Sequence, residues 1–132
     1  MLNFKLSELI HSDKAIEHNI NNMPDINSLD CMLDLICYCL QPIRDVFGKP
    51  IIITSGYRCQ EVNKLVKGSS NSQHTKGQAA DFIIKGLPVA DIVEIIEKSS
   101  IEYDQLINEY DKWVHISYVK GKNRKQKPFK IN

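Results

Sequence analysis

Two histidines and one aspartate have the residue types and the spacing of a metal site. His74 and Asp81 stand seven positions apart in a segment of small and polar residues, and His115 follows in the apolar run 113–117. Two imidazoles and one carboxylate form a three-ligand set that leaves the fourth tetrahedral position of Zn²⁺ open for water, as in catalytic rather than structural zinc sites. The set therefore predicts a Zn²⁺-dependent hydrolase.

Each of these three residues also has a simpler interpretation. His74 alone is typical of a surface loop, and His115 alone is typical of a buried core histidine. Asp81 lies in an otherwise apolar run, where an unpaired carboxylate is costly to desolvate, so either a cation or a basic side chain must accompany it. Small neighbours and Gly77, which permits a sharp turn, favour close approach of the backbone to a metal. The combination favours metal ligation.

A zinc hydrolase also needs a base that moves a proton, and a carboxylate close to the metal usually provides it. Glu109 is the first candidate, because a hairpin would bring it near His115; Asp111 is the alternative, and either residue can instead be a surface acid. Arg58 follows a strand end, and its planar guanidinium suits bidentate binding of a carboxylate. We expect Arg58 to orient substrate, with a surface ion pair as the alternative.

Helices precede strands along the chain. Apolar residues at helical spacing predict one or two short helices within 4–20 and a long helix over 26–47, which Pro42 should kink or divide. Shorter helices are expected over 61–66 and after Pro88. Strands are predicted at 51–54, 79–84, 105–109 and 113–119, the last two as a hairpin. This order predicts an α+β fold with N-terminal helices packed on a mainly antiparallel sheet.

Length and composition fit a single domain over residues 1–132 that we expect to be monomeric. Hydrophobic residues make up 42% of the chain and charged residues 25%, which is ordinary for a globular protein. No apolar run reaches the roughly 20 residues of a membrane span, and the N-terminal residues do not resemble a signal peptide. We therefore expect synthesis in the cytoplasm, with release needed to reach a substrate in the cell wall. The four cysteines show no CxxC pair and are expected to be free, mostly buried thiols.

Charge is distributed unevenly along the chain. The formal net charge is +1, but residues 120–132 hold six basic residues and no acid, so the remainder carries about −5. This basic tail is typical of a solvated, partly mobile segment; the alternative is attraction to a polyanion such as an anionic cell-wall polymer. The acidic remainder argues against nucleic-acid binding.

Three ordered sequence blocks carry a family resemblance. They are Ser55-Gly56-Tyr57-Arg58, Ser72-x-His74-x-x-Gly77-x-Ala79-x-Asp81 and Glu109-x-x-x-Trp113-Val114-His115. Together, over about residues 40–118, they resemble the zinc D-alanyl-D-alanine carboxypeptidase family, a group that includes lysostaphin-type enzymes, phage endolysins and the hedgehog signalling domain. The resemblance implies a hedgehog/D-Ala-D-Ala peptidase-like fold.

The resemblance also implies roles for single residues. His74, Asp81 and His115 match the zinc ligands of the family, Glu109 matches a glutamate of the hedgehog-like branch, and Arg58 matches an arginine that contacts substrate. Many members have His-x-His in the last block, where this chain has Trp113 at the first position. The histidine that is replaced helps to stabilise the transition state in those relatives.

The resulting hypothesis is a zinc-dependent peptidase that hydrolyses peptidoglycan stem peptides, either as a D-Ala-D-Ala carboxypeptidase or as an endolysin-type endopeptidase. The alternative is a non-catalytic, zinc-stabilised module that binds cell wall or protein, because the hedgehog branch uses a similar scaffold for recognition. The sequence leaves open which peptide bond is cut and whether the source is a bacterium or a phage.

Overall fold

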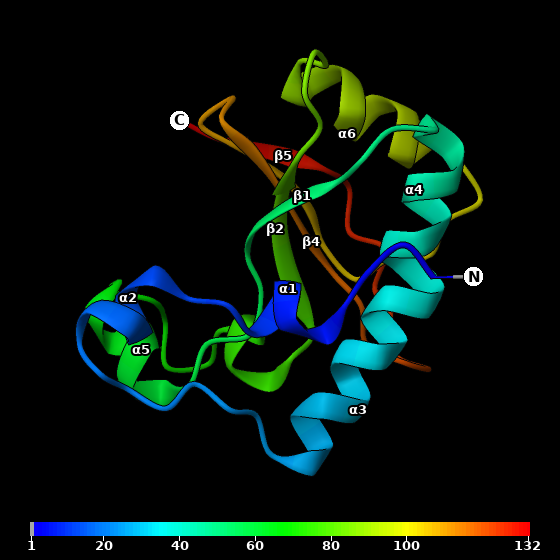
Figure 1. The fold of residues 1–132 in the computed structure, drawn as a ribbon. Coiled ribbons are helices and arrows are strands. Elements are labelled where there is room, and N and C mark those ends of the chain that lie inside the picture. The colour runs from blue at the N-terminus through cyan, green and yellow to red at the C-terminus, as the bar shows by residue number, and fades with distance from the viewer. Residues whose placement is uncertain (1) are drawn as a thin grey trace.

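A five-stranded sheet forms the centre of the protein in a computed structural model that describes residues 2–132 (Figure 1). Its strands are β1 (Ile52–Ser55), β2 (Ala79–Ile83), β3 (Leu106–Glu109), β4 (Trp113–Ser117) and β5 (Phe129–Ile131). The spatial order is β1-β2-β4-β3-β5; the first four strands pair antiparallel, and β5 pairs parallel to β3. The predicted α+β fold with a mainly antiparallel sheet is confirmed, including the β3–β4 hairpin.

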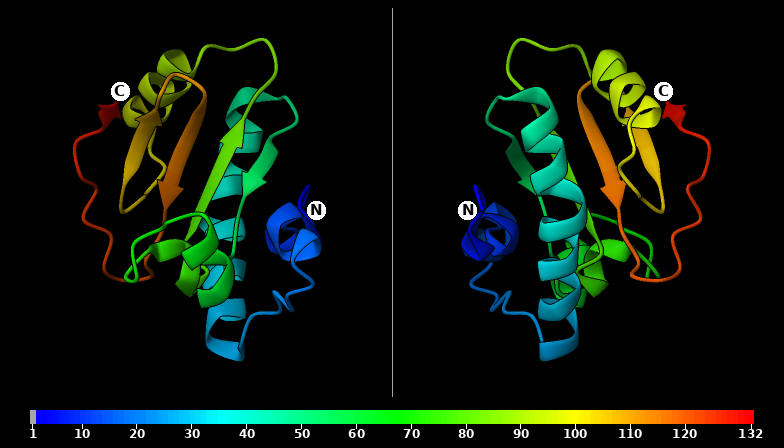
Figure 2. Two further views of the ribbon diagram at one scale, coloured as in Figure 1. Left: turned by 90° about the vertical axis from the view of Figure 1, so that its left-hand side faces the viewer. Right: turned by 90° about the vertical axis from the view of Figure 1, so that its right-hand side faces the viewer.

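Most helices precede the sheet in sequence. They are α1 (Leu6–Ile10), α2 (Asp13–Glu17), α3 (Ile26–Leu35), α4 (Gln41–Phe47), α5 (Gln60–Leu65) and α6 (Val89–Lys98), with a π-helical turn η1 (Ile36–Leu40) and a 3-10 turn η2 (Gln73–Lys76). The continuous run of α3, η1 and α4 lies across one face of the sheet, and α6 covers the same face near β3 and β4 (Figure 2). Within residues 2–132, no helix combines the length and the apolar character that crossing a bilayer requires.

Pro42 does not divide the long helical run. Instead, the turn before it widens into η1, in which the N–H of Gln41 donates to the carbonyl of Ile36, five residues earlier. A proline ring crowds the preceding helical turn and supplies no N–H, and a wider turn gives that ring room. The helix therefore continues through the proline to Phe47, where Gly48 ends it in a left-handed conformation at φ +63°.

The core lies between the sheet and the long helical run. Alternate residues of each strand point to opposite faces. Ala80 and Phe82 of β2 and Val114 and Ile116 of β4 therefore all enter the core, where they are fully buried. The intervening residues of both strands lie on the other face of the sheet, which the long helices leave free.

The basic segment 120–132 is held against the sheet. Its last residues form β5, and the backbone N–H groups of Lys125 and Gln126 donate to the carbonyls of Tyr103 and Asp104. The segment passes along the outer edge of the sheet (Figure 2). It is thus a strap along the edge of the sheet: its residues are solvated, as predicted, but the backbone is held in place rather than partly mobile.

The four cysteines are free thiols, as predicted. Only Cys39 is fully buried, and burial raises the pKa of its thiol far above the ordinary value. Cys37, in the same π-helical turn, is exposed, so the prediction of mostly buried thiols is wrong.

Candidate metal centre

The structure brings His74, Asp81 and His115 together on the free face of the sheet. Asp81 and His115 are directly paired across β2 and β4, so the alternation of the two strands projects both side chains to the same side. His74 reaches them from η2, in the loop that precedes β2. All three residues are buried, with exposed fractions of 3% to 8%.

The separations among these side chains fit one small cation. Asp81 Oδ1 lies 2.9 Å from His115 Nδ1 and 3.3 Å from His74 Nε2, and one ligand atom from each residue lies within 4.8 Å of the others. A tetrahedral ion with ligand distances of about 2.0–2.1 Å separates its donor atoms by about 3.3 Å. The separations from Asp81 are close to this value, so the three residues form a group that could hold a metal ion.

The hydrogen bond of His74 decides which of its nitrogens is available. His74 Nδ1 lies 2.7 Å from the carbonyl oxygen of Gly56, which can only accept, so Nδ1 carries the proton. Nε2 of the neutral ring then presents a lone pair to the carboxylate of Asp81. A positive centre between this nitrogen and the carboxylate, either a proton or a metal ion, stabilises the pair. Histidines that bind metals usually donate their other ring N–H to a backbone carbonyl or a carboxylate in this way.

Local structure fixes His74 in this position. The hydroxyl of Ser72 accepts from the backbone N–H of His74 and caps η2. Gly77 then turns the chain into β2 at φ +73°, and a side chain there would collide with the backbone of Ser28 and with Met32. Glycine is thus required both for the turn and for the close approach of α3.

Asp81 is ionised in this environment. Burial raises the pKa of its carboxyl, but the contacts with the imidazoles of His115 and His74 outweigh burial and hold the pKa well below its usual range. The residue therefore presents the anionic form that metal ligation needs.

Glu109 lies beside the three residues, held by Trp113. The indole N–H of Trp113 donates to Glu109 Oε2 at 2.9 Å, and Glu109 Oε1 lies 3.8 Å from His115 Nδ1. Asp111, the alternative acid, accepts from the side chain of Asn108 and pairs with Lys130 at 2.6 Å. The structure therefore brings Glu109 to the centre and directs Asp111 to the hairpin turn and the strap.

Arg58 lines the same hollow as Asp81, and most of its guanidinium N–H donors are unused. Its only side-chain hydrogen bond within the described residues is a long one, 3.4 Å, to the hydroxyl of Ser72, and its buried Nε has no partner there. Burial lowers the pKa of the guanidinium, while the charges of Asp81 and Glu109 act in the opposite direction. Arg58 is thus partly buried with unused donors, and within the described residues it makes no ion pair.

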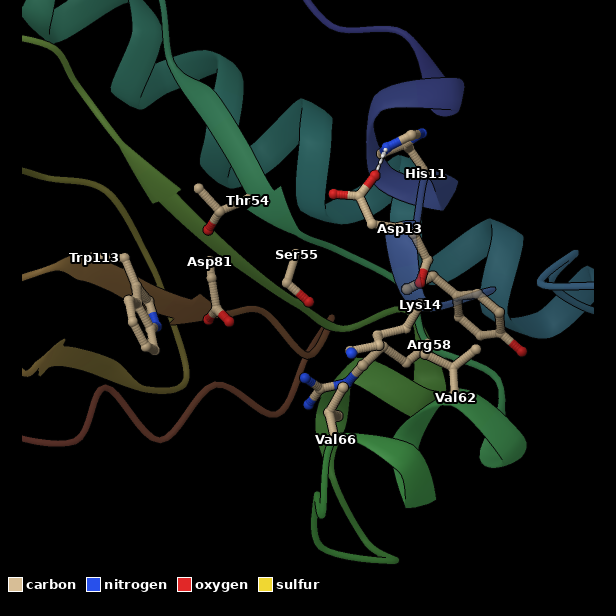
Figure 3. Close-up of a pocket in the computed structure, with 12 residues that line it drawn as sticks. His11, Asp13, Lys14, Thr54, Ser55, Arg58, Val62, Val66, Asp81 and Trp113 are labelled. Atoms are coloured by element: carbon tan, nitrogen blue, oxygen red, sulfur yellow. Dashed lines mark hydrogen bonds and ion pairs between the residues drawn. The ribbon is translucent and has the colours of Figure 1, made fainter. Parts of the chain in front are cut away.

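Two hollows meet the centre from opposite sides. The first, about 380 Å³, is lined by Asp81 and Trp113 and by two basic residues, Arg58 and Lys14 of α2 (Figure 3). The second, about 490 Å³, has His115 and Glu109 in its wall. Asp81 thus borders the first hollow and His115 the second.

A family model described as Peptidase M15 matches residues 2–117. The chain belongs to this family. No curated protein matches the sequence. Membership confirms the resemblance to the zinc D-Ala-D-Ala carboxypeptidase group and makes peptide hydrolysis the family activity.

Three features of this M15 peptidase lay beyond sequence reasoning. The carbonyl of Gly56 orients His74, and a backbone atom leaves no signal in residue types. Trp113 stands where relatives have histidine, and its residue type gives no sign that its N–H holds Glu109. Arg124, which lines the second hollow, belongs to no motif and is one basic residue among six in the C-terminal segment.

Proposed function

We propose that this M15 peptidase is a zinc-dependent enzyme that hydrolyses peptidoglycan stem peptides. The observation that carries the proposal is the convergence of His74 Nε2, Asp81 Oδ1 and His115 Nδ1 between two hollows, with the proton of His74 fixed on its other nitrogen. Peptide hydrolysis comes from the family, and the cell-wall substrate from the carboxypeptidase group that the sequence blocks resemble.

Zinc suits this set of ligand atoms. Two imidazole nitrogens and one carboxylate favour Zn²⁺ over Mg²⁺ or Ca²⁺, which prefer oxygen ligands. His74, Asp81 and His115 would hold the ion. A bound Zn²⁺ would supply Lewis-acid activation of the scissile carbonyl and of the attacking water.

Glu109 is the residue best placed to move protons. Its Oε2 is fixed by Trp113, which leaves Oε1 directed toward His115 and free to accept a proton from the attacking water. The same carboxyl then gives that proton to the leaving amine. The carboxylate of Asp111 accepts a hydrogen bond from Asn108 and pairs with Lys130, which supports Glu109 as the base.

Arg58 orients the substrate from the first hollow. Its unused guanidinium donors match the two oxygens of a carboxylate or the oxygen of a peptide carbonyl. Lys14 adds a second positive charge to the same hollow. These groups hold the peptide in line with the centre, which lowers the entropic cost of reaching a reactive geometry.

The test is digestion of purified peptidoglycan by the zinc-loaded protein, with mass analysis of the released fragments. We expect defined peptide fragments, whose masses also identify the bond that is cut. Glu109→Gln should lower the rate by about 10²-fold or more while zinc content stays unchanged. Glu97→Gln removes an exposed acid of α6 far from the centre and serves as the matched control.

The rival function, a zinc-stabilised binding module, makes the opposite prediction. Such a module would bind peptidoglycan, release no fragments and be indifferent to Glu109→Gln. Full activity of a preparation stripped of metal would refute the zinc mechanism.

A further inference from the structure

The second hollow has a composition that the catalytic role alone does not require. His115 and Glu109 line it together with Ile107, and the remaining residues of the wall are polar, with the amides of Gln78 and Gln105 among their groups. Two cations, Lys76 and Arg124, line it as well, and Glu109 is the one acid among the described residues of the wall. Positive charge thus faces a cavity that opens directly onto the metal centre.

The buried carboxylate of Asp104 fixes the side chain of Arg124 in place. Its Nε and Nη2 donate to the two oxygens of Asp104 at 2.9 and 2.7 Å, and its backbone N–H donates to the same carboxylate at 2.9 Å. Asp104 is 1% exposed and also accepts from the amide of Gln73. The hydrogen bond from Arg124 outweighs burial and lowers the pKa of Asp104 to about 2, so the pair is ionic.

This anchoring leaves one face of the guanidinium available. The side chain of Arg124 remains 56% exposed, and only some of its five N–H donors are engaged by Asp104. Because the buried carboxylate fixes the fork, a ligand need not order the side chain on binding. Asp104 and Glu109 together match the charges of Arg124 and Lys76, so the wall offers a ligand the unused N–H donors of Arg124 and the ammonium of Lys76 rather than an excess of charge.

Arg124 comes from the strap, beyond the residues that the family model matches. The strap is held by β5, by the Asp104 contacts and by the backbone bond from Lys125 to Tyr103. A segment that the matched family region does not include therefore contributes a wall of the cavity beside the metal centre.

We propose that the second hollow binds a carboxylate of an acidic peptide, on the opposite side of the metal centre from Arg58. The unused guanidinium donors of Arg124 and the ammonium of Lys76 suit the two oxygens of a carboxylate. Gln78 and Gln105 supply amides for the adjoining peptide groups. The inference rests on the proposed peptidase function and narrows its substrate to peptides with a free acidic side group beside the cleaved bond.

The experiment compares two synthetic stem peptides that differ only in the D-glutamate carboxylate, which is free in one and amidated in the other. Their affinities for the zinc-loaded protein are measured by calorimetry in a Glu109→Gln background, in which turnover is slow. The free carboxylate should bind about tenfold more tightly, the worth of one charge-assisted contact. Lys76→Gln, an exposed change, and Arg124→Gln should each remove most of this preference.

Control variants locate the effect. Lys122→Gln removes an exposed charge of the strap that does not line the hollow and should keep the preference. Arg58→Gln should lower the affinity for both peptides and leave their ratio unchanged. Equal affinity for the two peptides, a ratio that persists in both Lys76→Gln and Arg124→Gln, or a ratio that is lost only in Arg58→Gln would overturn the inference.

The inference and the proposed function fail separately. A preference for the free carboxylate without release of fragments by the unmodified chain would sink the peptidase function and leave the binding site standing. Release of fragments from both peptides at equal rates and affinities would do the reverse.

Discussion

The two faces of β2 and β4 differ in what they do, although the same ten residues build both. On the covered face, Phe82 and Val114 are fully buried against the helices. On the free face, Asp81 and His115, each adjacent in sequence to one of these residues, form part of the candidate metal centre. The alternation of a strand thus places apolar packing and a buried charged cluster one residue apart.

This arrangement separates stability from chemistry. The core side chains fix the strands, and the strands fix the spacing of Asp81 and His115 to within a cross-strand pair. Substitutions on the free face should abolish activity without changing the free energy of unfolding. Substitutions on the covered face should lower the free energy of unfolding, while the molecules that remain folded keep their metal ligands in place.

The largest effect is expected from Asp81→Ala. The variant loses the ligand atom that lies between the two imidazoles, so hydrolysis of peptidoglycan should fall to the rate of the protein-free control and zinc should be absent after dialysis. Circular dichroism should remain that of the parent. Retained zinc and activity would mean that the free face is not the metal centre.

Phe82→Ala tests the other face. Truncation of this buried ring should lower the free energy of unfolding by about 3–5 kcal/mol, measured by urea denaturation. At low temperature, where the variant is still folded, zinc stoichiometry should equal that of the parent. A loss of zinc from the folded variant would show that the two faces are not separable.

Gly77→Ala tests how the loop carrying His74 is attached to the sheet. The substitution forces a side chain into a left-handed conformation and against Ser28, which should cost about 1–3 kcal/mol and weaken zinc binding. Gly121→Ala is the control: its φ is +75°, but nothing lies within 4 Å of the added carbon. It should cost less and leave zinc affinity unchanged.

Trp113→Phe should have the smallest effect of the four. The ring is kept, but the N–H that holds Glu109 is lost, and kcat should fall about tenfold with little change in KM or zinc content. Trp113→His supplies an N–H again and should recover part of the loss. Equal activity of Trp113→Phe and the parent would mean that Glu109 needs no support.

The sequence predicted the parts of the molecule that depend on local pattern. The alternation in residues 113–117 predicted which side chains share a face with His115, and the structure has β4 over these residues. The run starting at Ala79 was placed correctly as a strand, one residue too long at its end. Metal-site spacing within ordered blocks identified three residues that the fold brings together.

The strap escaped prediction because its contacts are distant in sequence. The alternation in residues 129–131 extends over only three positions, too few to predict a strand, and these residues pair with β3, more than 20 residues earlier. Arg124 meets Asp104 across a similar interval. The charge of the segment predicts only that it is solvated. The tertiary structure shows that one of its six basic residues, Arg124, pairs with the buried carboxylate of Asp104.

The π-helical turn before Pro42 sets the rotational phase of the whole N-terminal half of the long helix. Each residue of an α-helix turns the chain by about 100°, so deleting one residue from the turn would swing α3 around its axis relative to α4. Ser28 and Met32 would then leave the underside of Gly77. The position of the loop that carries His74 thus depends on a single extra residue in a helix that contributes no candidate metal ligand.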